Sequence, residues 1–270
     1  MYRWMRIVCT ALLSLLLMAS PALADETLAA QIREHAGAHR LLVLGEYHGT
    51  RETPLLVAQL ADDYSRDGTP LVLALEMPRG ENASLQAYLD SDGDTEARRV
   101  LQARQFWKVT DDQHDGRRSR DMLELIEAMR VLAKQHRDVK VLGYDEDISE
   151  HGNQSRDDAQ AKALRRLHHE APSHARLVVL AGNVHAMRRR PADAPAEMQQ
   201  RPMASQLVDI DVYSVRLEAL KGEFWACMQR CQALPLRARA ARLPRVETAE
   251  DRMYDLTVWM PEFSVARLFD

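Results

Sequence analysis

The sequence predicts a single α/β domain with a mainly parallel sheet flanked by helices and with added antiparallel edge strands near the C-terminus. Four short, nearly continuous apolar runs each end in glycine or an acidic residue, a pattern typical of parallel strands buried on both faces. Segments with helical periodicity separate these runs, and such alternation favours a parallel sheet with right-handed crossovers. The 270 residues, of which 46% are apolar, have the composition of a globular chain.

The four apolar runs define the predicted central strands, which are Leu41–Glu46, Leu71–Glu76, Val139–Asp145 and Leu177–Gly182. Closer to the C-terminus, residues 207–217 alternate between apolar and polar types, and residues 255–260 do so more briefly. Alternation of this kind is typical of strands with one solvated face. We therefore expect two added edge strands there, with antiparallel pairing as one option.

Three segments between the strands have the signals of helices. Thr53 followed by Pro54 indicates a helix start. Residues 122–133 carry an apolar stripe at helical spacing, preceded by Ser119 in an N-cap position. The third helix is expected to start at Ser155, where acidic residues in the first turn suit the helix dipole.

Residues 1–24 are predicted to be a cleaved secretory signal. A short basic start precedes the apolar run of residues 7–18, and Ala22-Leu23-Ala24 forms a small-residue cleavage site before Asp25. The apolar run is too short to span a bilayer, and no lipid-acceptor cysteine follows it. We therefore expect a periplasmic or secreted protein of residues 25–270 without a stable membrane anchor.

Cys227 and Cys231 are the two cysteines of residues 25–270. An oxidising compartment favours a disulfide between them, and the alternative is a pair of free thiols. Three intervening residues exclude the CxxC spacing of a redox motif. A turn is expected between them, because the Cβ atoms of residues i and i+4 in a regular helix lie wider apart than a disulfide prefers.

The candidate site residues follow the ends of the predicted strands. They are Glu46, Tyr47 and His48 after the first strand, Glu76 after the second, and Asn183 and His185 after the fourth. Two of these segments share the spacing Gly-x-x-His, in which glycine allows a sharp turn off the strand. Ligands of open α/β sheets bind beyond the carboxyl ends of the strands. We therefore expect Glu46, His48, Glu76 and His185 to converge at one edge of the sheet.

Three further residues each have two interpretations. Asp145 follows the third strand, but it belongs to a run of three acids, which is as typical of a solvated loop as of a site. Trp107 and Arg117 lie on a polar segment before the second helix. A guanidinium beside an aromatic ring is a common ligand clamp, and the alternative is a capped helix with a packed tryptophan.

Several of these motifs together resemble a known family. They are the phrase LGEYHG at residues 44–49, Glu76, the helix start Arg156-Asp157, and GNVHA at residues 182–186. Over about residues 40–220 the chain resembles the ChaN-like branch of the haem-uptake and Tiki superfamily, which includes haem-binding ChaN-like lipoproteins, Tiki metalloproteases, TraB-like proteins and erythromycin esterases. The resemblance implies an α/β fold in which Glu46 and His48 match the first active-site pair, Glu76 the second glutamate and His185 the distal histidine. The chain departs from the lipoprotein pattern in having no lipid-acceptor cysteine.

Two functions are consistent with this site. The favoured one is hydrolysis of an ester or amide bond, with Glu46, His48, Glu76 and His185 as catalytic residues and with Tyr47, Trp107, Arg117 and Asn183 around the substrate. Either these four catalytic residues, with Asp145, hold zinc, manganese or a similar divalent metal, or His48 acts as a metal-free general base.

The alternative function is haem binding, with Tyr47, His48 or His185 as the axial ligand. The expected partner is a small-molecule or peptide substrate. Nucleic acid is a poor candidate because the net charge is −4.

Overall fold

The computed structural model describes residues 27–109, 114–146, 152–191, 193–194, 200–240, 245–249 and 252–269. The predicted signal segment and its cleavage site lie outside the described residues. The strands are β1 (Leu41–Glu46), β2 (Leu71–Pro78), β3 (Val139–Asp145), β4 (Arg176–Gly182), β5 (Val212–Ala219), β6 (Glu223–Cys227), β7 (Cys231–Pro235), β8 (Val246–Thr248) and β9 (Leu256–Met260). The helices are α1 (Leu28–Ala36), α2 (Glu52–Ser65), α3 (Asn82–Asp90), α4 (Thr95–Gln102), α5 (Arg120–Lys134) and α6 (Gly152–Glu170).

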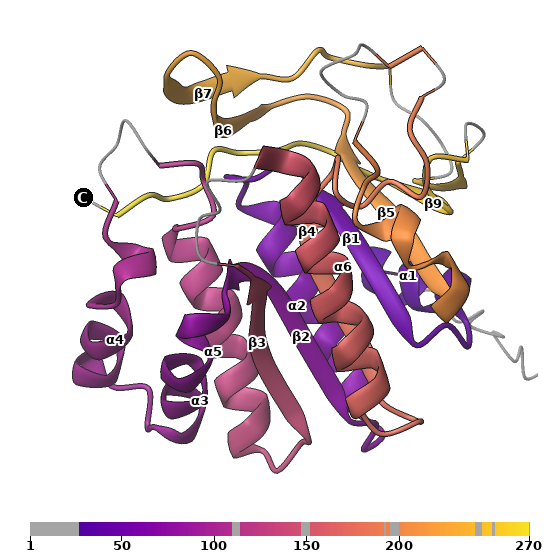
Figure 1. Cartoon of the computed structure of the whole chain (residues 1–270). Helices are drawn as coiled ribbons and strands as arrows, with labels where there is room; N and C mark the ends of the chain where they lie inside the picture. Colours follow the sequence, from indigo (N-terminus) through magenta and orange to yellow (C-terminus); the bar gives the residue numbers. More distant parts are fainter. Residues whose placement is uncertain are drawn as a thin grey trace, which may run out of the picture.

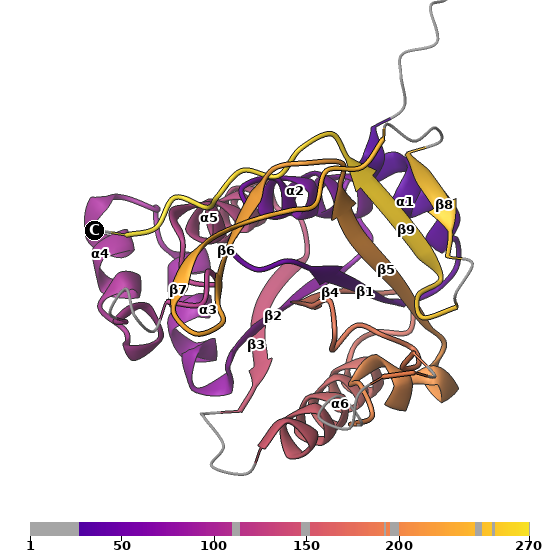
Figure 2. The ribbon, with the colours of Figure 1, turned by 90° about the horizontal axis from the view of Figure 1, so that it is seen from above.

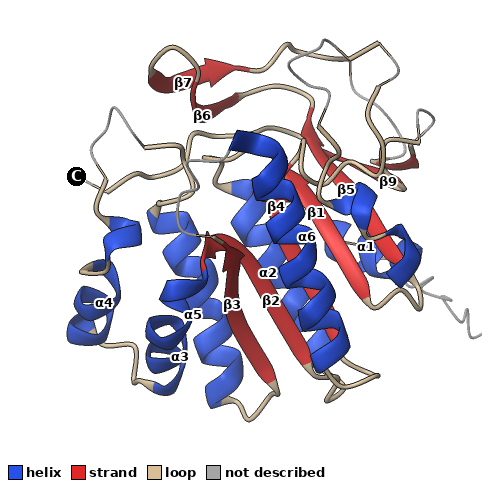
Figure 3. Cartoon of the chain, viewed as in Figure 1, coloured by secondary structure: helices blue, strands red, loops and turns tan. Residues whose placement is uncertain are grey.

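A seven-stranded sheet in the order β3-β2-β4-β1-β5-β9-β8 forms the centre of the described structure (Figure 1). Its neighbouring strands pair in parallel, except that β8 at the edge is antiparallel to β9. A separate antiparallel hairpin, β6–β7, lies beyond the sheet (Figure 3). The predicted fold class, a mainly parallel sheet with helices and C-terminal antiparallel strands, is confirmed.

Helices cover both faces of the sheet. Seen from above, α6 lies on one side, and α1, α2 and α5 lie on the other (Figure 2). Alternate residues of β1 contribute to two separate apolar clusters: Leu42 and Leu44 pack with the α2 side, while Val43 packs with Leu164 of α6. Burial on both faces explains why the central strands are continuous apolar runs rather than alternating ones.

The C-terminal strands differ from the expectation of antiparallel edge strands. Both β5 and β9 pair in parallel, and β5 lies between β1 and β9. The polar residues of β5 that suggested a solvated face instead have partners inside the protein. The Ser214 hydroxyl donates to the Ala186 carbonyl at 2.5 Å, and Glu218 pairs with Arg216. The antiparallel pairing comes from β8 and from the hairpin.

Three local predictions have clear outcomes. The Ser119 hydroxyl accepts the backbone N–H of Met122 at 3.1 Å and caps α5, as expected. Cys227 and Cys231 form a disulfide that closes the turn of the β6–β7 hairpin, which confirms both the pairing and the turn. The third predicted helix, α6, starts at Gly152, earlier than expected. Across the described ranges, no helix is both long and apolar enough to cross a membrane.

Candidate active site

The carboxyl ends of β2, β4 and β1 bring the four predicted catalytic residues together. Glu46, the last residue of β1, pairs with Gly182, the last residue of β4. On the other side of β4, Glu76 accepts the backbone N–H of Gly182 at 2.8 Å. His48 and His185 both reach over this glycine: a Cβ atom built there would lie 3.0 Å from His48 Nε2 and 3.4 Å from His185 Cδ2.

His48 is held by two glutamates. Its Nδ1 lies 3.0 Å from Glu46 Oε1, and its Nε2 lies 3.7 Å from Glu76 Oε2. A carboxylate at Nδ1 accepts the ring N–H, so the neutral imidazole presents an unprotonated Nε2. Burial alone would lower the pKa of His48, but the negative charge of Glu76 and the hydrogen bond with Glu46 outweigh it and raise this pKa above 6.5. Burial raises the pKa of Glu46, against the effect of its hydrogen bond with His48.

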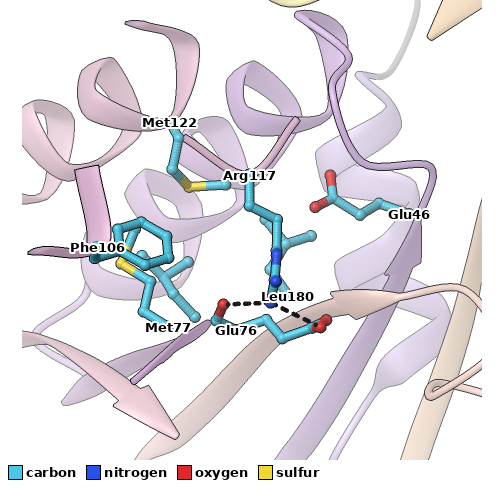
Figure 4. A pocket seen from close by; sticks show the side chains of 8 residues that line it. Glu46, Glu76, Met77, Phe106, Arg117, Met122 and Leu180 are labelled. Carbon is cyan, nitrogen blue, oxygen red and sulfur yellow. Dashed lines mark hydrogen bonds and ion pairs between the residues drawn. The ribbon is translucent and has the colours of Figure 1, made fainter. Parts of the chain in front are cut away.

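Two arginines from different segments of the chain, Arg117 and Arg156, donate to Glu76. Arg117 Nη1 donates to both the backbone carbonyl and Oε1 of Glu76 at 3.1 Å, beside apolar side chains that include Phe106 and Met122 (Figure 4). Arg156 Nη2 donates to the same Oε1 at 2.5 Å. Although burial favours the neutral acid, the charges of His48 and the two arginines hold the pKa of Glu76 well below its usual value. Glu76 is therefore a fixed carboxylate.

Asp145 joins this network as an ion-pair partner. It is buried, and its Oδ2 lies 2.5 Å from Arg156 Nη2. Its Oδ1 accepts the side-chain N–H of Gln160 at 3.0 Å. Asp145 is thus not part of a solvated acidic loop, because the arginine and the amide compensate its burial.

A second carboxylate–imidazole pair was missed from the sequence. His185 Nδ1 lies 2.7 Å from Oδ1 of Asp157, a residue with no exposed surface that also accepts the backbone N–H of Met203 at 2.8 Å. The interpretation of Asp157 as a dipole-compensating residue of the first helical turn is therefore wrong, because α6 starts earlier and turns this side chain inward. The resemblance included Arg156-Asp157 only as a helix start, with no site role for either residue.

The residues at the site do not fit a divalent metal. The guanidinium groups of Arg117 and Arg156 occupy the contacts of Glu76 that a cation would need, and Arg156 Nη1 lies 3.4 Å from His185 Nε2. Two fixed positive charges among the expected ligands oppose a third. Within the described residues, moreover, no group of three or more His, Cys, Asp or Glu side chains is placed to hold an ion.

An open cleft of about 380 Å³ lies against these groups. Its lining comprises Glu46, Tyr47, His48, Asp115, Gly182, Asn183, Val184, His185, Phe224, Ala226 and Cys227. Tyr47 and Asn183 thus lie where a substrate pocket was expected. The Tyr47 hydroxyl donates to Glu218 Oε1 at 3.3 Å.

Trp107 and Arg117 do not lie together at the cleft: Trp107 packs among aromatic rings, whereas Arg117 belongs to the ion-pair network. Trp107 is only 7% exposed, packs edge-on against Phe106 and Phe269, and is absent from the cleft lining, so the packed-tryptophan interpretation holds. Arg117 is a partly buried bridge: besides Glu76, it contacts Asp115 through Nε at 2.9 Å. Arg117 therefore reaches the cleft through Asp115, a lining residue, and does not form a clamp with the tryptophan.

No family model and no curated protein matches this chain. Solved structures share its fold. The erythromycin esterase EreC, in its open conformation, aligns at a TM-score of 0.66 and 12% identity over 89% of this chain and 95% of its own. A Bacillus cereus protein aligns at 0.59 and 10% identity, over 89% and 92%. A succinoglycan biosynthesis protein aligns at 0.58 and 10% identity, over 88% and 92%. The chain therefore shares its fold with these three structures, one of which is an erythromycin esterase.

Gly182→Ala is expected to reduce any activity of this site strongly while leaving the protein folded. Gly182 does not have a positive φ, so its backbone accepts alanine, but the new methyl would crowd His48 Nε2 and His185 Cδ2. A displacement of catalytic groups by about 1 Å costs roughly 10²-fold in rate, whereas the overpacking itself costs about 1 kcal/mol. Kinetics and thermal unfolding measure the two effects. Gly68→Ala is the control for activity only: a Cβ there meets open space, but the φ of +84° strains alanine and should lower stability. Equal activity losses in both variants would contradict the expectation.

Proposed function

We propose that the protein is a metal-independent hydrolase that cleaves an ester bond with His48 as the general base. The observation that carries the proposal is the Glu46–His48 pair: Glu46 holds Nδ1, so Nε2 is left as a base on the cleft side, beside Glu76. The EreC structure, which shares the fold, is named an esterase, and this supports the choice of an ester over an amide.

In the proposed reaction, His48 Nε2 removes a proton from water as the water oxygen attacks the ester carbonyl carbon. The imidazolium that forms is stabilised by the carboxylates of Glu46 and Glu76. Positive charge of Arg156, beside His185 Nε2, faces the negative charge that develops on the carbonyl oxygen. The carbon–oxygen bond of the ester then breaks, and the alcohol leaves with the proton that His48 took from the water, while Asp157 holds His185 through its Nδ1 at 2.7 Å.

The same proposal includes the place of action. The predicted signal segment and the Cys227–Cys231 disulfide both support an extracytoplasmic protein. A small molecule is the proposed substrate, because the cleft of about 380 Å³ lies near the small end of ligand pockets.

An ester panel tests the proposal. Purified protein is assayed on uncharged alkyl and aryl esters before and after treatment with a metal chelator, and again after addition of zinc or manganese. We expect hydrolysis that neither treatment changes. Activity that the chelator removes and the metal restores would contradict the metal-independent mechanism. Absence of hydrolysis, together with a sharp Soret band on haemin titration that is lost in His48→Ala, would establish the haem-binding alternative.

The pH dependence of kcat/KM gives a second prediction. His48 acts as a base only when neutral, and its pKa is raised above 6.5, so activity is expected to be low in acid and to rise with pH through a midpoint above 6.5. Glu46→Gln removes a charge and a hydrogen bond that favour the protonated ring, and the midpoint should therefore move to lower pH. Profiles of both proteins over about pH 5 to 9 measure this. An unchanged midpoint in Glu46→Gln would show that another group controls the profile.

A further inference from the structure

The β6–β7 hairpin forms one wall of the cleft. Phe224 and Ala226, two residues apart on β6, line the cleft together with Cys227 of the disulfide. Phe224 also packs against Tyr47, with ring centroids 4.8 Å apart and a tilt of 58°. The residues that follow β1 and β4 contribute His48 and His185 to the same lining. The cleft therefore combines apolar and aromatic side chains of the hairpin with the ionisable side chains at the strand ends.

Backbone contacts fix this wall relative to the proposed base. The backbone N–H of Trp225 donates to the Gly49 carbonyl, next to His48, at 3.0 Å. The indole N–H of Trp225 donates to the His114 carbonyl at 2.5 Å. A Cβ atom on Gly49 would lie 2.6 Å from Trp225, and one on Gly116 would lie 2.6 Å from Gly49. Glycines at these two turns thus permit direct backbone packing, and the hairpin is a fixed wall rather than a loose cover.

The charges around the cleft have one predominant sign. Glu46 and Asp115 line the cleft, whereas none of the described residues that line it is lysine or arginine. Beneath them, Glu76 and Asp145 pair with Arg117 and Arg156, while Asp157 pairs with His185, so carboxylates outnumber guanidinium groups among these residues. Although burial opposes ionisation, the charges of Arg117 and Arg118 hold the pKa of Asp115 well below its usual value. An anionic substrate would meet uncompensated negative charge.

We propose that the cleft selects small, uncharged esters with one aromatic group, which packs against Tyr47 and Phe224 on the hairpin side, and that it disfavours anionic esters. This inference deepens the proposed hydrolase function and rests on it. The aromatic group of the ester gains burial against these two rings. It also gains tilted ring contacts of the kind that Phe224 makes with Tyr47. Fixed backbone packing of the hairpin limits the size of group that fits.

Three acetate esters test the inference: ethyl acetate, benzyl acetate and a benzyl acetate that carries a ring carboxylate. For the unmodified protein, kcat/KM should be highest for benzyl acetate and lower for the carboxylated ester than for its neutral counterpart. In Phe224→Ala, the ratio of kcat/KM for benzyl over ethyl acetate should fall by roughly tenfold, as expected when an apolar pocket loses part of its wall. Phe224→Leu, which keeps an apolar side chain of intermediate size, should give an intermediate ratio.

Met228→Ala is the matched control, because Met228 belongs to the same hairpin turn, is 78% exposed and does not line the cleft. Its selectivity should equal that of the unmodified protein. Thermal unfolding shows whether each variant is folded. An unchanged ratio in both Phe224 variants, or a preference for the carboxylated ester, would overturn this inference while leaving the hydrolase proposal intact. If the unmodified protein cleaves no ester of any kind, the hydrolase proposal itself fails.

Discussion

His48→Ala is expected to abolish ester hydrolysis while the protein stays folded. The proposed mechanism has one base for the attacking water, and general-base catalysis contributes about 10²- to 10⁴-fold in rate. His48 also supplies the positive charge that Glu46 and Glu76 stabilise in the transition state, so we expect a loss of about 10³-fold in kcat/KM. Steady-state kinetics on the best ester of the panel measures this loss.

The stability of His48→Ala should change little. The side chain lies in a loop after β1, is 22% exposed and is absent from the apolar clusters. The carboxyl of Glu46 would lose its partner, but burial already raises the pKa of this group, so it can take up a proton in response. His169→Ala on the exposed side of α6 is the matched control and should keep full activity. Retention of more than about a tenth of kcat/KM by folded His48→Ala would exclude His48 as the general base.

The central strands could be predicted from the sequence because their physical cause is local. A strand covered by helices on both faces needs apolar side chains at every position, and this requirement defined β1 to the residue. The bounds of the edge strand β3 also matched the prediction, although its Lys140 is exposed. The ends of these strands then located Glu46 and Asp145. Parallel strands place their carboxyl ends at one edge, and so the grouping of residues 100 or more positions apart also followed from the pattern.

The rest of the site depends on contacts that no local pattern records. Asp157 was assigned to a helix terminus because acidic residues favour first turns in general, and only the packing of α6 against β4 shows its contact with His185. Arg156 is similar: its partners Glu76 and Asp145 come from two other strands. The position of β5 inside the sheet was also hidden, because its polar residues are satisfied by buried partners and not by water.

The hairpin wall could not be predicted for a different reason. The cysteine spacing identified the turn, but which surface β6 covers depends on the glycines at positions 49 and 116, where the backbones touch. Gly49 was recognised only as part of a motif. Its positive φ of 69° and its contact with Trp225 show a further structural role for the motif, namely to seat the hairpin beside His48.

Arg156→Met is expected to lower the free energy of unfolding more than any other substitution considered above. Arg156 bridges Glu76 and Asp145, whose side chains are only 3% and 7% exposed, and methionine fills similar space without the charge. Removal of one partner of a buried ion pair costs about 3–5 kcal/mol, because it leaves an uncompensated buried charge. Arg117 still contacts Glu76, and Gln160 still contacts Asp145, so the lower end of this range, about 3 kcal/mol, is expected. Denaturant unfolding measures the change.

Two further variants separate this electrostatic effect from a loss of packing. Arg166→Met removes an arginine of the same helix that is 54% exposed, and its effect should be within about 0.5 kcal/mol. The double variant Arg156→Met with Asp145→Asn removes the carboxylate charge that lost its partner and should recover part of the stability. A double variant no more stable than Arg156→Met alone would show that the loss of stability arises from packing around α6. In that case the buried carboxylates of Glu76 and Asp145 would not need the charge of Arg156.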